Sequence, residues 1–242
     1  MEKTEENKKP IKNRKRFIKF LNIFIIVAAV LLLAFEGVLY YQRSYLTPFW
    51  VNGQSMYPTL NEHAIDAQGN ELGKNFGSAD VGYTVDYGVM DTHKSAINKI
   101  KRFDIIVTKY KSSDTKNKIK RVIGLPGETV EFISTGVGNE HNGDLYINGE
   151  YIEQPIGESF IREGKYYSSH CKKTVLGENQ YFVCGDNRGY SDDSREEGPI
   201  EKSYITGKVV AVCGTCVVVK KDGTYDIDNI DYKWPKYLNK NK

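Results

Sequence analysis

The chain has 242 residues, of which 40% are hydrophobic, so it can bury a core and is not an intrinsically disordered protein. Its formal net charge is +3, but residues 1–19 contain eight Lys or Arg and three Glu, which leaves −2 on the remainder. Nucleic-acid binding needs a basic face on the folded part of a protein, so this distribution argues against nucleic acid as a partner.

The longest apolar run of the sequence covers residues 20–41. At a rise of about 1.5 Å per residue, a helix of this length reaches about 33 Å, enough to cross a hydrocarbon core about 30 Å thick. We therefore predict a basic arm over residues 1–19 and a transmembrane anchor over residues 20–41. A cleaved secretory signal peptide is the alternative, but the run is long and no small-x-small cleavage site follows it.

The charges on the two sides of this run are unequal. The basic arm precedes it, whereas Arg43 alone flanks its other end closely. The positive-inside rule then predicts a cytoplasmic N-terminus, with everything from about Ser44 onward outside. We expect a single-pass protein of the cell membrane with an extracytoplasmic domain over residues 44–242.

Beyond the anchor, the sequence pattern is typical of β-structure. Short segments rich in Val, Ile, Tyr and Phe are separated by turn dipeptides, and no helical period lasts long enough to form a second apolar face. We predict an all-β fold, an antiparallel and partly barrel-like β domain that follows one N-terminal transmembrane helix. The predicted strands are residues 104–108, 121–123, 129–133, 145–147, 181–184 and 207–219, and the turns are Pro126-Gly127, Asn142-Gly143, Asn148-Gly149 and Asp222-Gly223.

Residues 61–100 differ from this pattern. They contain many glycines and have mixed polarity, without the alternation of the other segments. We interpret them as a long insertion with irregular or short-strand structure.

Four cysteines lie in the part predicted to be outside, where oxidising surroundings permit disulfides. The even count is compatible with the pairs Cys171–Cys184 and Cys213–Cys216, although the sequence does not decide their state. The CxxC motif has no second ligand pair and no βαβ context, so it is poor evidence for a metal or thioredoxin-like site. Two β-branched runs flank Gly214-Thr215, which predicts a hairpin with or without a disulfide.

Ser55 is the first candidate catalytic residue in the sequence. It lies in VNGQSMYPTL (51–60), and the segments KRFDIIV (101–107), KIKRVIGLPGET (118–129) and VCGDNRGYSDDSR (183–195) follow in that order. Together with the anchor, these segments resemble the four ordered boxes of the bacterial type I signal peptidases, which use a Ser-Lys dyad. The resemblance covers the anchor and most of residues 48–210, and it is weak across residues 61–100 and beyond about residue 212.

A serine nucleophile needs a base, and a lysine can serve only when it is neutral. Burial against apolar neighbours disfavours the ammonium and lowers the pKa of a lysine. Strand alternation over residues 119–123 puts Lys120 and Arg121 on opposite faces, so that one can be buried while the other is solvated or ion-paired. Lys118 shares the face of Lys120, so alternation does not separate them. The resemblance assigns the base to Lys120.

The resemblance also implies how the dyad is completed. The main-chain N–H of Ser55 is the expected oxyanion donor. Many members carry a second donor, a serine hydroxyl, where this chain has Gly53, so that donor is unassigned. Ser191 is expected to lie beside Lys120 and to orient it through a hydrogen bond. Phe103 replaces the usual glycine of its segment, which alters the turn before the strand.

Six residues are expected to support the site without performing chemistry. A carboxylate and an amide in a tight turn more often cap backbone groups than react, which is how we interpret the GDNR segment. The resemblance implies an ion pair between Asp193 and Arg195. The support residues are Arg121, Asp186, Asn187, Arg188, Asp193 and Arg195.

The resemblance implies a membrane-anchored serine endopeptidase that removes N-terminal signal peptides from exported preproteins, cutting after small residues. Its partners are then these preproteins and the lipid bilayer. No cofactor or metal is expected, since His63, His93, His141 and His170 show no ligand spacing.

Two alternatives are considered. A self-cleaving repressor shares the Ser-Lys logic but needs a DNA-binding module where this chain has an anchor. A membrane-tethered β module that binds a partner without catalysis needs neither Ser55 nor Lys120, and both are present. A signal peptidase with a histidine base is excluded because Lys120 occupies that position.

Overall fold

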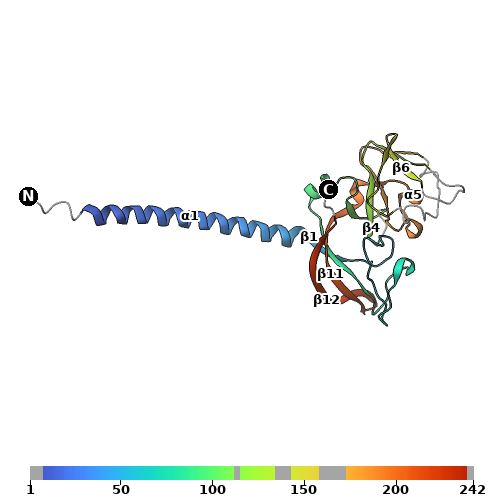
Figure 1. Ribbon diagram of the computed structural model, residues 1–242, viewed down its shortest axis with the longest axis horizontal. Coiled ribbons are helices and arrows are strands. Elements are labelled where there is room, and N and C mark those ends of the chain that lie inside the picture. Colours follow the sequence, from blue (N-terminus) through green and yellow to red (C-terminus); the bar gives the residue numbers. More distant parts are fainter. Residues whose placement is uncertain (1–7, 112–114, 134–142, 158–172, 239–242) are drawn as a thin grey trace, which may run out of the picture. The chain divides into compact units, whose positions relative to one another are not determined.

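The computed structural model describes residues 8–111, 115–133, 143–157 and 173–238 (Figure 1). The chain separates into two compact units, residues 1–45 and residues 46–242, which are taken in turn. Cys171, His141 and His170 lie outside the described residues, and so does the predicted pair Cys171–Cys184.

The first unit is a single helix, α1 (Lys8–Tyr45), which contains the predicted anchor. Its leucines are largely exposed, Leu31 at 65% and Leu33 at 69%. A helix that is apolar on all sides is stable only when something covers it, as lipid does. α1 is long and apolar enough to cross a membrane. Helical structure stops before Pro48, which disfavours the helical conformation of the residue that precedes it.

The second unit consists mainly of antiparallel strands, which confirms the predicted fold class. The larger sheet has eight strands in the order β1-β2-β11-β3-β4-β9-β10, with β12 paired to β11, and it curls into a half-barrel (Figure 1). Its strands are β1 (Leu46–Trp50), β2 (Thr84–Asp91), β3 (Ile105–Thr108), β4 (Lys118–Gly124), β9 (Gln180–Cys184), β10 (Ile200–Glu201), β11 (Ile205–Lys221) and β12 (Thr224–Tyr237).

The smaller sheet has the order β7-β6-β5-β8, and its Phe132 and Leu145 share an apolar core with Phe182 of β9 in the larger sheet. Its strands are β5 (Thr129–Ile133), β6 (Asp144–Ile147), β7 (Glu150–Ile152) and β8 (Thr174–Val175). The short helices are α2 (Lys94–Asn98), α5 (Ser194–Glu197) and the 3-10 turns η1 (Gly73–Asn75), η2 (Arg188–Tyr190) and η3 (Lys202–Tyr204).

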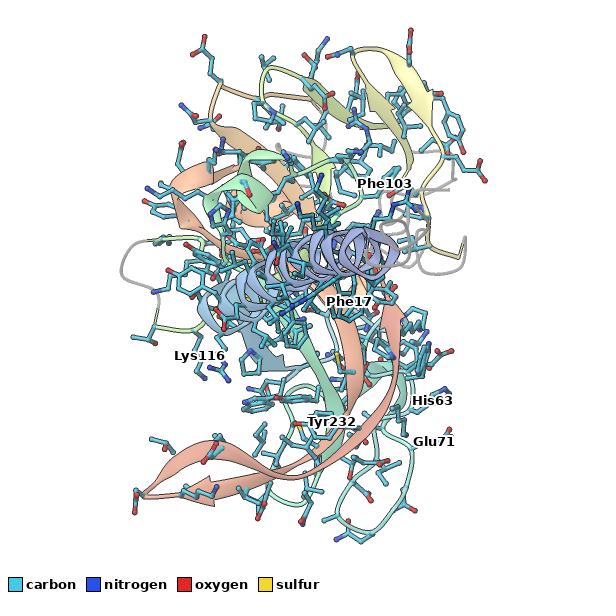
Figure 2. All side chains as sticks on the ribbon, turned by 90° about the vertical axis from the view of Figure 1, so that its left-hand side faces the viewer. Phe17, His63, Glu71, Phe103, Lys116 and Tyr232 are labelled. Atoms are coloured by element: carbon cyan, nitrogen blue, oxygen red, sulfur yellow. The ribbon has the colours of Figure 1, made fainter. Side chains whose placement is uncertain are left out.

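β11 connects the parts of the larger sheet. This 17-residue strand pairs with β3 at its start, with β2 along its middle and with β12 toward its end. Register shifts interrupt all three ladders, and such bulges bend a strand and increase its twist. On β12, Tyr232 (Figure 2) meets Tyr87 of β2 edge to face, with ring centroids 6.0 Å apart. A single bent strand therefore serves three partners.

The hairpin predicted around Gly214-Thr215 is wrong. β11 passes straight through this dipeptide, and the chain reverses at the predicted turn Asp222-Gly223 instead. Gly214 accommodates a bulge rather than a turn. Cys213 and Cys216 thus lie three residues apart on one extended strand, about 10 Å, whereas a disulfide needs Cα atoms within about 7 Å. Both thiols are free, so this disulfide is excluded.

Residues 61–100 are more regular than the sequence pattern indicated. They contain β2, an eight-residue strand that pairs with β1 on one side and β11 on the other. Val85 and Met90 of β2 are buried in the core. This part of the segment is therefore integral to the larger sheet, while residues 61–83 are mostly turns.

Replacing Gly214 with alanine should lower the free energy of unfolding by about 2 kcal/mol or more, because glycine alone readily adopts its φ of +153° and a Cβ would overlap the Asp231 carbonyl oxygen. Urea denaturation of the detergent-solubilised chain measures the change. Gly223→Ala is the matched control, since Gly223 also has a positive φ, +81°, but a Cβ there meets open space. Equal losses for the two variants would contradict the assignment of a close backbone contact at Gly214.

Candidate active site

Ser55 lies in the loop between β1 and β2, and this loop packs onto the core. Met56 and Leu60 of this loop are almost fully buried, at 1% and 0% exposure. The Asn61 side-chain amide donates to the carbonyls of Val51 and Gly53, at 2.9 and 3.1 Å. The loop is therefore anchored at its start and end while Ser55 stays partly accessible.

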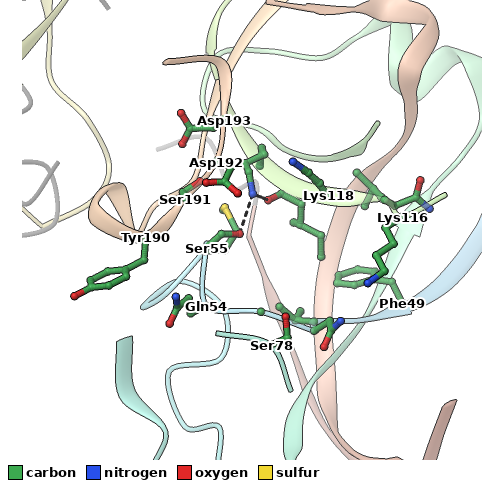
Figure 3. Close-up of a pocket in the computed structure, with 18 of the residues that line it drawn as sticks. Phe49, Gln54, Ser55, Ser78, Lys116, Lys118, Tyr190, Ser191, Asp192 and Asp193 are labelled. Carbon is green, nitrogen blue, oxygen red and sulfur yellow. Dashed lines mark hydrogen bonds between the residues drawn. The ribbon is translucent and has the colours of Figure 1, made fainter. Parts of the chain in front are cut away.

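Lys120 reaches Ser55 from the middle of β4, where it pairs with Ile106 of β3. Lys120 is only 3% exposed. Its Nζ lies 2.8 Å from the Ser55 Oγ and 3.0 Å from the carbonyl oxygen of Ile119 (Figure 3). The structure thus brings together the predicted nucleophile and the predicted base, which are 65 residues apart in the sequence.

The surroundings of Lys120 favour its neutral form. Burial lowers the pKa of Lys120 from 10.5 to about 8, although the Asp193 carboxylate opposes this and the Lys118 ammonium assists it. Near neutral pH, a lysine with this pKa has a usable neutral fraction, whereas a solvated lysine has almost none. The neutral amine has a lone pair that can accept the Ser55 hydroxyl proton.

Arg121 points to the other face of β4, as alternation predicts, but it is buried as well, at 4% exposure. Its Nε donates to Asp186 Oδ1 at 2.7 Å and its Nη2 to Asp186 Oδ2 at 2.5 Å. The Thr59 hydroxyl donates to the same carboxylate at 2.5 Å. This network joins the nucleophile loop, β4 and the turn after β9. Asp186 therefore binds side chains rather than capping a turn.

Phe103 completes the contacts of Arg121. It has a φ of +69°, the left-handed conformation that glycine adopts readily, and its carbonyl accepts a hydrogen bond from Arg121 Nη1 at 2.8 Å. Its ring packs against the core of the smaller sheet, which offsets the strain of this conformation. A residue other than glycine thus adopts the left-handed conformation at this position.

Asn187 and Arg188, in the segment after β9, hydrogen-bond to main-chain groups around the serine loop and the turn. The Asn187 N–H donates to the Ser55 carbonyl at 3.1 Å, and its side-chain amide donates to the carbonyls of Gln54 and Lys74, at 3.2 and 2.9 Å. Arg188, which is 1% exposed, donates to the Gly185 carbonyl at 2.9 Å and to the Gln154 side chain at 2.5 Å.

The predicted ion pair of Asp193 and Arg195 is present and bidentate, with both N–O distances 2.8 Å. Burial alone would raise the pKa of Asp193, but the Arg195 guanidinium overcomes this and lowers it to about 2. Asp193 also caps α5 and accepts the Gly185 N–H at 2.9 Å. This carboxylate is therefore charged throughout the neutral range.

Ser191 does not make the expected hydrogen bond to Lys120. Its hydroxyl oxygen is buried, and no atom of the described chain bonds to it. It lies against Gly185, where a Cβ would overlap both the Ser191 hydroxyl and the Ser55 carbonyl oxygen. Gly53 pairs with Ser78 as an isolated antiparallel bridge, and its carbonyl accepts from the Asn61 side chain at 3.1 Å.

The dyad opens into a cavity of about 900 Å³ (Figure 3). Apolar side chains from β1 to β4 line one part, and the segment after β9 lines another. The lining includes Phe49, Met90, Val107, Ile119, Lys116, Lys118, Ser78, Tyr190 and Asp192. An extended polar chain fits such a cavity, with its backbone held by main-chain groups and its side chains facing the apolar wall.

The sequence profile of the family described as "Signal peptidase, peptidase S26" matches residues 16–214. The chain belongs to this signal peptidase family. Among its curated relatives, Signal peptidase I V of Bacillus subtilis is 34% identical over 66% of this chain and 80% of the relative. Signal peptidase I S of the same organism is 31% identical over 76% and 82%. Signal peptidase IB of Staphylococcus aureus is 28% identical over 68% and 75%.

A crystal structure of a signal peptidase I from Enterococcus faecalis covers 46% of this chain and 96% of that chain, with 30% identity and a TM-score of 0.34. The family match includes α1 from residue 16 onward, Ser55, Lys120 and the whole GDNR segment, and it ends within β11. As a member of the signal peptidase family, the chain is a serine peptidase and hence a hydrolase.

Three site residues of this signal peptidase were missed by sequence reasoning. Thr59 and Asn61 lie in or beside the serine segment, but Thr59 donates to Asp186, 127 residues away, and Asn61 also accepts the Asp86 N–H, 25 residues away. Gly185 had a local signal, because a glycine between a buried strand and a tight turn often marks a close backbone approach.

Replacing Asp186 with asparagine should lower the free energy of unfolding by about 3–5 kcal/mol, because it leaves the Arg121 guanidinium buried without a countercharge. Urea denaturation of the detergent-solubilised chain measures this loss. Glu128→Gln is the matched control, because it removes the countercharge of Arg102 in an ion pair whose side chains are more exposed, at 18–20%. It should lower the free energy of unfolding by only about 1 kcal/mol. If both variants lost the same free energy, burial would not be what makes the Asp186 pair important.

Proposed function

We propose that this chain is a membrane-anchored serine endopeptidase that removes N-terminal signal peptides from exported preproteins by a Ser55–Lys120 dyad. The observation that carries the proposal is the 2.8 Å approach of the Lys120 Nζ to the Ser55 Oγ in a buried setting that lowers the pKa of the lysine. Membership of the signal peptidase family supports the substrate class.

Acylation follows from this geometry. Neutral Lys120 takes the Ser55 hydroxyl proton as the oxygen attacks the scissile carbonyl carbon, and the resulting ammonium returns the proton to the leaving amine. The product is an acyl-enzyme in which the signal peptide is esterified to Ser55. Water, activated by the same lysine, then hydrolyses the ester and regenerates the dyad.

The negative charge that develops on the carbonyl oxygen needs a hydrogen-bond donor. The main-chain N–H of Ser55 supplies one, because no carbonyl of the described chain accepts it. Asn187 holds the Ser55 carbonyl from the opposite side, which fixes the orientation of the residue. Such preorganisation reduces the reorganisation that the reaction would otherwise require.

Location restricts the substrate. Ser55 lies ten residues beyond the end of α1, and ten residues of chain span at most about 35 Å. With the basic arm in the cytoplasm, this is the side on which an exported preprotein presents the end of its signal segment. An extended peptide occupies the cavity with its small side chains against the apolar wall, and cleavage follows a small residue.

Signal-peptide cleavage by the detergent-solubilised full chain tests the dyad. Ser55→Ala and Lys120→Met should each lower kcat/KM by about 10³-fold or more, because each removes a group that bonds or transfers a proton in the transition state. Ser78→Ala and Lys116→Met are matched controls at the wall of the same cavity, and they should stay close to wild type. Wild-type activity in either dyad variant would exclude the mechanism, and an inactive wild type would favour a binding module.

The pH dependence tests the base separately. Because only neutral Lys120 accepts a proton, kcat/KM should rise about tenfold per unit of pH at low pH and level off above about pH 8. A solvated lysine would place this midpoint near 10.4, and a histidine would place it near 6.5. Steady-state rates between pH 5 and 10 with a peptide that has no titratable side chain would distinguish these three cases.

A further inference from the structure

A second lysine faces the same cavity as the dyad. Lys118 and Lys120 are two residues apart on β4, so their side chains leave the same face of the strand, with Cα atoms about 7 Å apart. Both line the cavity, on whose wall Figure 3 labels Lys118. Strand alternation alone did not separate these two lysines, but the structure gives them different surroundings.

Lys118 lies over an aromatic ring. Its Nζ lies 4.6 Å from the centroid of the Tyr110 ring, within the range of a cation–π interaction, which stabilises an ammonium. The residue is half-buried, and within the described parts of the chain no carboxylate forms an ion pair with it. Its field is therefore neither cancelled by a direct partner nor fully screened by water.

Several other groups act on Lys120 from the elements packed around it. The Asp193 carboxylate, at the start of α5, favours the ammonium, but the Arg195 guanidinium is bonded to both of its oxygens. Asp192 is exposed and also favours the ammonium. The groups that face Lys120 are Lys118 on β4, Cys184 on β9, Asp192 and Asp193 before α5, and the Ser55 hydroxyl.

We propose that Lys118 is a positioning residue of the dyad, whose fixed positive charge on the shared cavity wall holds Lys120 in the neutral form that can accept the Ser55 proton. The inference rests on the proposed function. Burial by itself disfavours any charge at Lys120, and the like charge of Lys118 adds to that effect. Lys118 acts through Lys120 and does not contact the reacting atoms.

The sign of the effect provides the test. Without the Lys118 charge, the Lys120 ammonium becomes easier to form, so the midpoint of kcat/KM against pH should rise. A like charge that is partly screened by water gives a shift of about half a unit to one unit, which is about a 3–10-fold loss of kcat/KM at pH 7. Lys118→Met should show this rise, and Lys118→Arg should keep the wild-type midpoint because it keeps the charge.

Asp192→Asn should shift the midpoint of kcat/KM against pH in the direction opposite to Lys118→Met. Removing this carboxylate should lower the midpoint, and combining it with Lys118→Met should bring the midpoint back toward wild type. Lys116→Met removes a lysine charge from the rim of the same cavity and should leave the midpoint unchanged. A loss of packing cannot produce shifts of opposite sign, so midpoints that move in the same direction for Lys118→Met and Asp192→Asn would overturn the proposal.

A readout without turnover keeps this proposal separable from the proposed function. Competitive labelling of the full chain in detergent with acetic anhydride reports the neutral fraction of Lys120 at each pH, and mass spectrometry of the peptide that contains Lys120 quantifies it. The labelling midpoint should rise by the same half to one unit in Lys118→Met. An unchanged midpoint overturns the role of Lys118 even if the chain cleaves preproteins, whereas a raised midpoint in a chain that cleaves nothing supports that role and removes the proposed function.

Discussion

Burying the amine of Lys120 beside the Ser55 hydroxyl is the constraint on which the site depends. An ammonium loses its hydration when it is buried, so the folded chain favours the neutral amine, which is the form that can act as a base. The Lys120 Nζ lies 2.8 Å from the Ser55 Oγ, so the two groups are in direct contact. Met56 and Leu60 of the serine loop are buried in the core and hold this loop in place. Packing and chemistry thus have one physical cause.

The buried charged side chains near the dyad are stabilised by ion pairs rather than by contact with water. Arg121 with Asp186, and Asp193 with Arg195, are buried and bidentate, so each pair makes directional hydrogen bonds as well as opposing its charges. Replacing such a pair with apolar residues is often neutral for stability, which indicates that its value here is geometric. The two pairs fix the turn after β9 against β4 and α5, and the serine loop is bonded to that turn.

Richness in Val, Ile, Tyr and Phe between turn dipeptides predicted six of the strands, namely β3, β4, β5, β6, β9 and β11, because this composition is a local signal. The hairpin at Gly214 was wrong because a glycine between β-branched runs has the same local pattern in a bulge as in a turn. Lys118 and Lys120 could not be separated, since their difference comes from Ser55, Tyr110 and burial, which are set by tertiary contacts. The expected Ser191 hydrogen bond is absent because that hydroxyl lies against Gly185 instead.

The distance along the chain between the members of the dyad has a consequence for biosynthesis. Ser55 meets a lysine 65 residues later, and its loop is bonded to Asp186, which follows β9. A nascent chain that has released only the serine loop has neither base nor wall, so it holds an ordinary serine that cannot attack its neighbours. Under the proposed mechanism, hydrolytic activity therefore becomes available only when the last of these segments has been synthesised and folded.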